Sequence, residues 1–177
     1  LFWDASAESL GIGTTSPAQK LDVAGTAPNI RVTNTRQITW SGSEKLGGVE
    51  WHTVDTSANG PLTGASIYCE NSEASTIPSF NIVFATQAHN NASAPIQRMR
   101  IADDGEISFY NAAGTTAKLF WDASAERLGI GTTSPTTDLH VYHPTSHSEI
   151  RVGTSGSSDS KVPAVSFNNT VVEWGIG

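Results

Sequence analysis

The sequence is poor in charged residues, in cysteine and in long apolar runs, and each shortage excludes a class of protein. Charged side chains make up 15% of the chain, with 10 Lys and Arg against 17 Asp and Glu. Because binding to phosphate backbones needs a clustered basic face, nucleic acid is not expected as a partner. Cys69 is the single cysteine, so no intramolecular disulfide can form, and its strand-like neighbours predict a packed thiol. No apolar run reaches the ~20 residues that a membrane helix requires, and no signal peptide opens the chain, so membrane insertion is not expected.

Helix-forming patterns are also nearly absent. The best stretch, Asp4 to Glu8, and its copy at 122–126 are too short for a helix. The rest of the chain alternates short apolar runs with clusters of Gly, Asn, Asp and Ser, which is typical of short strands joined by turns. In the second half, strands are predicted at 97–101, 106–110, 118–121, 127–130 and 138–142, with turns at 103–105 and 111–114. The sequence therefore predicts an all-β protein.

An internal repeat is the dominant feature of the chain. Residues 1–17 read LFWDASAESLGIGTTSP and residues 119–135 read LFWDASAERLGIGTTSP, so the two blocks differ only at Ser9 and Arg127. Weaker matches follow in the same order, pairing 21–23 with 139–141, 30–32 with 150–152, and 49–51 with 172–174. A period of this length is too long for a simple solenoid. It indicates compact modules that are separated by connectors.

We therefore divide the chain into four regions: a shaft connector at 1–25, a β-rich knob at 26–96, a second connector at 97–143, and the truncated start of a second knob at 144–177. In the knob, strands are predicted at 30–32, 37–40, 48–54, 65–70 and 80–86, with polar loops between them. Short strands with clear turn signals are typical of a small β-sandwich or barrel-like knob. The chain does not begin with Met and ends at Gly177 without a polar tail, so we expect a segment of a longer protein.

The strands of the connectors are too short to form a core within one thin chain, because isolated hairpins of this size are marginally stable in water. Identical chains wound around a common axis would bury the apolar side chains and cover the strand edges. The residues expected to pack along that axis lie in both copies of the repeat block: Leu10, Ile12, Leu21, Val23, Leu128, Ile130, Leu139 and Val141. The glycines between them permit tight turns and close approach of the backbones. The residues thus predict an elongated, intertwined β-oligomer.

Two stretches carry a resemblance to a known family. They are LFWDASAESLGIGTTSPAQKLDVAG at 1–25 and RMRIADDGEISF at 98–109. The pattern Leu-Gly-Ile-Gly-Thr-Thr-Ser-Pro, followed by a polar stretch and Leu-x-Val, resembles the tail fibres of tailed bacteriophages, especially those of marine cyanobacterial hosts. In that family such blocks recur along the shaft, often ahead of a C-terminal self-cleaving chaperone domain. The catalytic serine and lysine of that domain are not recognisable in this chain.

The resemblance implies a homotrimer with threefold symmetry, attached to the virion at one end and exposed to the extracellular medium. Its partners would be two further copies of the chain, other fibre or baseplate proteins, and a glycan or protein on the host surface. The intertwined β-oligomer follows from the residues, whereas the number three comes from the family.

Loops in the knob are the candidate receptor-binding sites. Aromatic platforms next to Asn side chains suit sugars, so we name Trp40, Asn59, Asn90 and Asn91 as candidates for glycan binding. Trp51 is a different case, because it recurs as Trp174 within an apolar strand and is therefore expected to pack in a core.

The histidines at 140, 143 and 147 carry donors for a transition metal, but alternation along the strand directs His140 to solvent, and no metal site is expected. The acidic pair Asp103-Asp104 precedes a glycine, which indicates turn chemistry in preference to paired catalytic carboxylates. The glycine pairs of the repeat lack the third glycine and the helix of a dinucleotide loop. We predict no catalytic residues and no cofactor, so the protein is not expected to be an enzyme.

The leading hypothesis is a structural and adhesive segment of a phage tail fibre, which attaches to the host by multivalent receptor binding. One alternative is a fibre or decoration protein of the phage head. Another is a polysaccharide depolymerase with its active site between chains, which would release reducing ends from host polysaccharide. A bacterial surface adhesin is a further alternative, and it would carry secretion signals elsewhere in the gene.

Overall fold

The computed structural model describes residues 1–35, 42, 44–54, 62–72, 79–88 and 94–150. Within these residues the protein consists of strands and turns, as the sequence predicts, and no segment forms a helix of the length and apolarity that a membrane span requires. The strands are β1 (Phe2–Asp4), β2 (Ser9–Ile12), β3 (Leu21–Val23), β4 (Lys45–Thr53), β5 (Leu62–Asn71), β6 (Phe80–Thr86), β7 (Ile96–Ile101), β8 (Ile107–Tyr110), β9 (Ala117–Asp122), β10 (Arg127–Ile130) and β11 (Leu139–Val141).

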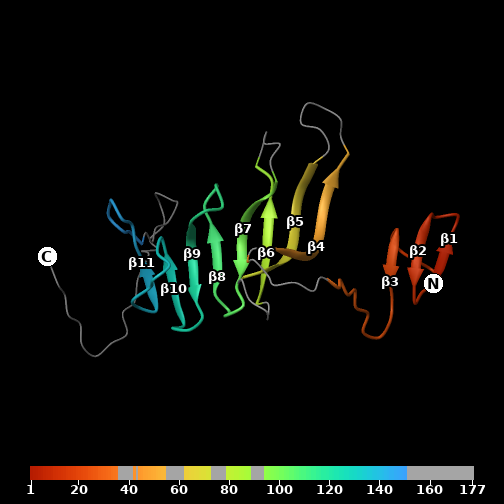
Figure 1. Ribbon diagram of the computed structural model, residues 1–177, viewed down its shortest axis with the longest axis horizontal. Coiled ribbons are helices and arrows are strands. Elements are labelled where there is room, and N and C mark those ends of the chain that lie inside the picture. Colours follow the sequence, from red (N-terminus) through yellow and green to blue (C-terminus); the bar gives the residue numbers. More distant parts are fainter. Residues whose placement is uncertain (36–41, 43, 55–61, 73–78, 89–93, 151–177) are drawn as a thin grey trace, which may run out of the picture.

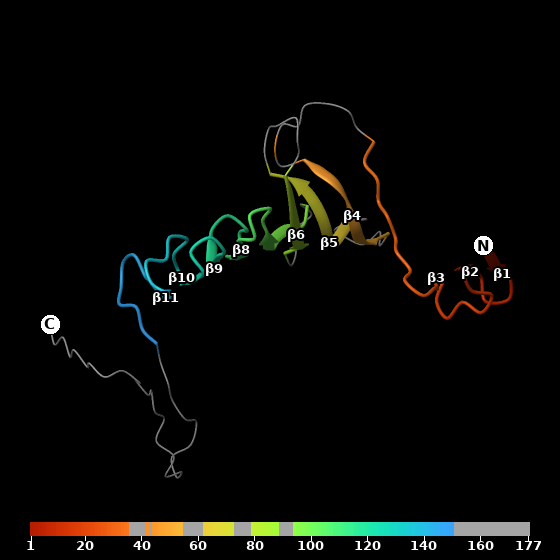
Figure 2. The same ribbon diagram turned by 90° about the horizontal axis from the view of Figure 1, so that it is seen from below.

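The strands form two sheets. β1, β2 and β3 make a three-stranded sheet, and β4 to β11 make an eight-stranded sheet in which the spatial order of the strands follows the sequence (Figure 1). Neighbouring strands are antiparallel except for two parallel pairs, β2 with β3 and β10 with β11. Within the described residues, each strand contacts only the strands to which it is hydrogen-bonded. The eight-stranded sheet is therefore a single layer, which Figure 2 shows from below.

Turn chemistry fixes the hairpins of the eight-stranded sheet. Between β7 and β8, Gly105 adopts a φ of 89° and donates its N–H to the Ala102 carbonyl at 3.0 Å. Between β8 and β9, Gly114 has a φ of 71° and donates to the Asn111 carbonyl at 3.0 Å. Glycine adopts such left-handed conformations without the steric cost that a Cβ would add. Both turns lie where the sequence predicts them.

The two repeat blocks adopt the same local fold. Trp3 lies opposite Leu10 in the first block, and Trp121 lies opposite Leu128 in the second. After the second strand the chain turns at Gly13 and Gly131, each with a φ of 81°. The third strand of each block then returns parallel to the second. We call residues 1–24 the N-terminal module and residues 119–142 the C-terminal module.

The structure corrects one strand of the predicted knob. Residues 30–32 form no strand and instead belong to an irregular segment, whose residue Asn34 donates its side-chain N–H to the Leu46 carbonyl at 3.2 Å. The segment lies close over β4, because a Cβ added to Gly47 would come within 2.7 Å of the Val32 side chain. The alternating pattern Ile-Arg-Val here reflects packing across a strand, and not pairing beside one.

The predicted knob at 26–96 and the predicted connector at 97–143 share one continuous sheet. β4, β5 and β6 pair with one another, and β6 continues into β7. No second layer of described strands covers them, so the predicted sandwich or barrel-like knob stays a prediction. The predicted strand at 37–40 and most of the predicted second knob, from residue 151 onward, lie outside the described residues.

Candidate functional site

The register of the eight-stranded sheet aligns apolar side chains into two rows on one face. Residues directly opposite each other on neighbouring strands point to the same side of a sheet, as do residues two apart in one strand. The first row, from β4 to β11, is Gly47, Cys69, Ile82, Ile101, Ile107, Trp121, Leu128 and Leu139. The second row is Val49, Ile67, Phe84, Met99, Phe109, Leu119, Ile130 and Val141. We call this surface the apolar face.

Much of the apolar face is uncovered in the single chain. Ile130 is 40% exposed and Leu139 is 49% exposed, although a buried sheet face would enclose such side chains. In contrast, the three buried apolar residues of the described chain, Val83, Ala85 and Phe120, all point to the opposite side of the sheet. Most of the large apolar side chains of the sheet thus lie on the face that is partly open to solvent. A contiguous apolar surface of this kind marks a contact site.

The opposite face buries polar side chains, some of which are hydrogen-bonded to one another. Glu70 and Asn81 are buried there, and the Asn81 amide donates to Glu70 Oε1 at 3.4 Å. The same Asn81 accepts the backbone N–H of Asp103 at 3.2 Å through Oδ1. Burial, together with the nearby carboxylates of Asp104 and Asp122, raises the pKa of Glu106. These contacts bury small and polar side chains and leave the apolar face as the side that lacks a cover.

The predicted axis residues pair with one another within each of the two modules. They form four side-by-side pairs across the two parallel ladders: Leu10 with Leu21, Ile12 with Val23, Leu128 with Leu139, and Ile130 with Val141. The last two pairs are part of the apolar face, and the first two form the equivalent surface of the N-terminal module. The structure describes one chain, so packing of these pairs against other copies stays a prediction.

The repeat indicated only the end of the apolar face, and its extension over β4 to β8 was not predicted. Met99 and Ile101 alternate with Arg98 and Arg100, and this period of two is the signal that could have revealed the extension. Trp51, which is predicted to pack in a core, is 54% exposed in the single chain. Trp51 lies two residues from Val49 in β4 and therefore extends the apolar face.

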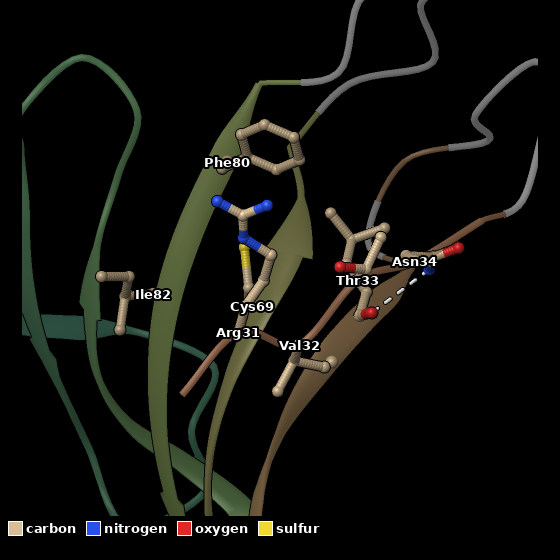
Figure 3. A pocket seen from close by; sticks show the side chains of 9 residues that line it. Arg31, Val32, Thr33, Asn34, Cys69, Phe80 and Ile82 are labelled. Atoms are coloured by element: carbon tan, nitrogen blue, oxygen red, sulfur yellow. Dashed lines mark hydrogen bonds between the residues drawn. The ribbon is translucent and has the colours of Figure 1, made fainter. Parts of the chain in front are cut away.

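A groove of about 640 Å³ interrupts the apolar face at β4 to β6. The irregular segment at 31–34 forms one wall, and strand residues that include Cys69, Phe80 and Ile82 form the other (Figure 3). Burial and the nearby Glu70 carboxylate raise the pKa of the Cys69 thiol, so the thiol is protonated near neutral pH. The walls of the groove are mostly apolar. The ionisable side chains among its lining residues are Arg31 and the protonated Cys69 thiol, and they do not form a catalytic set.

The receptor candidates Trp40, Asn59, Asn90 and Asn91 all lie outside the described residues. Of the histidines at 140, 143 and 147, His140 makes an edge contact with Tyr142 at 5.9 Å between ring centroids, and His143 Nδ1 accepts the Ser146 N–H at 3.0 Å. Across the described part of the chain, no three His, Cys, Asp or Glu side chains converge as metal ligands would.

No protein-family model matches the chain, and a search of the curated proteins finds no match. Function must therefore be argued from the repeat block and from the geometry of the sheet.

Proposed function

We propose that this chain is a segment of a bacteriophage fibre, with a tail fibre as the leading assignment. The segment assembles as a homotrimer and mediates attachment to the host surface. The observation that carries the proposal is the apolar face, which runs across eight consecutive strands of a one-layer sheet. Neighbouring strands lie about 4.8 Å apart, so the two rows extend for about 34 Å along the direction in which the chain advances. A surface of this length requires a cover that is equally long and equally apolar.

Another copy of the same chain meets these requirements. The two rows contain no charged side chain, so charge complementarity cannot select a partner, and a second apolar face has the same strand spacing. Full burial of a half-exposed large apolar side chain contributes about 1 kcal/mol. The eight row residues of β8 to β11 would therefore contribute about 8 kcal/mol per chain. Association costs about 4–15 kcal/mol, so these strands alone give marginal assembly, and the whole length of the face is needed.

The number of copies is supported by the resemblance of the repeat block to phage fibres. Three sheets placed with their apolar faces inward would enclose a continuous core and direct the polar face of each sheet outward. The fibre would then be stiff along its axis. The role proposed for this segment is mechanical and adhesive, without catalysis and without a cofactor.

Attachment to the host is assigned to the polar loops of the region 26–96, with Trp40, Asn59, Asn90 and Asn91 as the glycan contacts. Each contact would be weak, and presentation of three copies per fibre at fixed spacing would raise the avidity. The other partners proposed are fibre or baseplate proteins of the virion, which would hold the far end of the assembly.

Sedimentation of two matched variants tests the proposal. Leu119 belongs to the second row of the apolar face, whereas the exposed Lys118 beside it lies at the register shift between β8 and β9 and belongs to neither row. The wild-type chain should sediment as three copies of an 18.7 kDa chain at all micromolar concentrations, with a high frictional ratio. Lys118→Glu should keep that mass, whereas Leu119→Glu places a charge in the enclosed core and should give monomers or unfolded chains. A monomeric wild type, or a Leu119→Glu variant that keeps the trimer mass, would overturn the proposal.

A further inference from the structure

The N- and C-terminal modules share the backbone hydrogen bonds that close the loop before the third strand. In the N-terminal module the Leu10 N–H donates to the Lys20 carbonyl at 2.8 Å. In the C-terminal module the Leu128 N–H donates to the Asp138 carbonyl, also at 2.8 Å. The strand registers of the two modules match as well. The two modules therefore provide an internal comparison of the side chains that hold the same backbone.

One side-chain hydrogen bond has the same place in both modules but a different acceptor. In the N-terminal module, Asp22 Oδ2 accepts the N–H of Ala18 at 2.9 Å. At the equivalent position of the C-terminal module, His140 Nδ1 accepts the N–H of Thr136 at 3.4 Å. Each bond ties the loop between the second and third strands to the third strand. A carboxylate thus holds this loop in one module, and an imidazole holds it in the other.

A second imidazole holds the turn that follows β11. His143 Nδ1 accepts the N–H of Ser146 at 3.0 Å and lies 2.8 Å from the Ser146 hydroxyl. The N-terminal module has Gly25 at the equivalent position. Elsewhere in the chain a carboxylate makes the same kind of contact, since Asp122 Oδ1 accepts the Ala125 N–H at 2.9 Å. The C-terminal module therefore uses imidazole acceptors at two places, one on each side of its third strand.

Both hydrogen bonds require a neutral imidazole. A backbone N–H can only donate, so Nδ1 of each ring must be the unprotonated nitrogen, and the ring proton is on Nε2. A protonated imidazole donates from both nitrogens and accepts from neither. Imidazoles usually take up the second proton between about pH 5 and pH 8, whereas a carboxylate stays charged down to about pH 4. The two histidine bonds are therefore present above the imidazole range and are lost as the pH falls through it.

Charged groups of both signs surround the two rings. On the face of the sheet that carries His140, β9 contributes Asp122 and β10 contributes Arg127, and Asp138 directly precedes β11. His143 lines a hollow of about 480 Å³, whose other titratable lining residues include Lys118, His147 and Glu149. The hydrogen bonds to the backbone N–H groups are the contacts that require each ring to be neutral.

We propose that the C-terminal module is a pH-sensitive element of the chain, in which protonation of His140 and His143 releases the loop before β11 and the turn after it. A proton from solvent binds Nδ1 of each ring, and the N–H groups of Thr136 and Ser146 then turn to water. His140 lies between Leu139 and Val141, so its release loosens the strand at the end of the apolar face. The N-terminal module, with Asp22 as acceptor, stays closed over the same pH range. The switch lies within one chain and does not depend on the proposed trimer.

Amide hydrogen exchange of the full chain, measured by NMR across pH, tests the inference. The quantity compared is the protection of each amide, which is the ratio of its intrinsic exchange rate at a given pH to the observed rate. Protection of Thr136 and Ser146 should fall about three- to tenfold between pH 7.5 and pH 5.0, as the loss of one hydrogen bond predicts. Protection of Ala18 should stay constant, because its acceptor is the Asp22 carboxylate. The same sample thus contains the test and its control.

Two variants assign the effect to each ring. His140→Asp gives the C-terminal module the acceptor of the N-terminal one and should remove the pH dependence at Thr136 while leaving it at Ser146. His143→Asn supplies an amide oxygen in place of Nδ1 and should have the converse effect. Protection of Thr136 and Ser146 that does not change with pH in the wild type, or that still falls in the matching variant, would overturn the inference. An equal fall at Ala18 would also overturn it. The mass of the chain in solution enters none of these comparisons, so a monomeric wild type would contradict the proposed trimer alone.

Discussion

The turn at Gly131 should be among the positions of the C-terminal module that are most sensitive to substitution. Gly131 has a φ of 81°, and a Cβ at this position would overlap the carbonyl oxygen of Tyr142. Its N–H donates to the Lys118 carbonyl at 2.8 Å, and Tyr142 donates to the Ile130 carbonyl at 2.8 Å. The residue thus lies where β9, β10 and the end of β11 are joined, and any shift that makes room for a methyl group must move this junction.

The cost of Gly131→Ala follows from two effects. A left-handed backbone costs a residue with a Cβ about 1–2 kcal/mol. Relief of the overlap by displacement of packed backbone costs a further 1–3 kcal/mol, roughly. We therefore expect Gly131→Ala to lower the free energy of unfolding by about 2–5 kcal/mol. Gly13→Ala should show a similar local effect in the N-terminal module, because Gly13 has the same φ and a Cβ there would overlap the Ala24 carbonyl oxygen.

Gly25→Ala is the matched control. A Cβ at Gly25 would meet no atom within 4 Å, so this variant should be neutral or more stable by about 0.4–1 kcal/mol, through the lower entropy of the unfolded chain. Urea unfolding of the wild type and the three glycine variants at one fixed protein concentration provides the comparison, because assembly makes apparent stability depend on concentration. If Gly131→Ala and Gly25→Ala unfold at the same urea concentration, the turn does not hold β10 and β11 together as we argue.

Three predictions concern titration. The pKa of Asp122 lies below its usual value of 3.8, chiefly because the carboxylate accepts hydrogen bonds from the Ala125 N–H and the Ser124 hydroxyl. The contribution of Asp122 to stability is therefore present above pH 3.8 and is lost as the pH falls below that value. The raised pKa of Glu106 has the opposite sign: its contribution is full below pH 4.5 and declines as the pH rises. Glu106→Gln should therefore flatten the decline in stability above pH 4.5, as measured by urea unfolding across pH, and an unchanged profile would contradict this assignment. The Cys69 thiol should react with an aromatic disulfide more slowly than free cysteine at pH 8, since its pKa is raised, and an equal rate would mean that the thiol is not shielded.

Strand positions were predictable because local chemistry determines them. The strands at 80–86 and 127–130 have the predicted bounds, since alternating apolar residues lie between clear turn signals. The turns at Gly105 and Gly114 follow from residues that adopt left-handed backbone at little cost. The segment 30–32 shows the limit of this reasoning. Two apolar residues two positions apart give the same sequence pattern in a strand that pairs with a neighbouring strand and in an irregular segment that packs on the face of a sheet.

Pairing partners were not predictable from local chemistry. The sequence indicates strands at β10 and β11 but does not reveal that they are parallel, because the turn at Gly131 and the loop after it determine the return path. The candidate site was predicted in part for a related reason. The repeat drew attention to Leu128, Ile130 and their partners, whereas the alternation in β5 and β6 was attributed to a knob. Only the register shows that all these residues lie on one uncovered face.

The distance between copies at the apolar face tests the central claim most directly. In a Cys69→Ser background, a spin label is placed at Ile130→Cys on the apolar face or at Arg127→Cys, which lies on the opposite face of the same strand. Pulsed electron paramagnetic resonance then measures the distances between labels. The account predicts one short distance with the modulation depth of three coupled spins at Ile130, and a clearly longer distance at Arg127. A shorter distance at Arg127, or no coupling at either position, would contradict assembly through the apolar face.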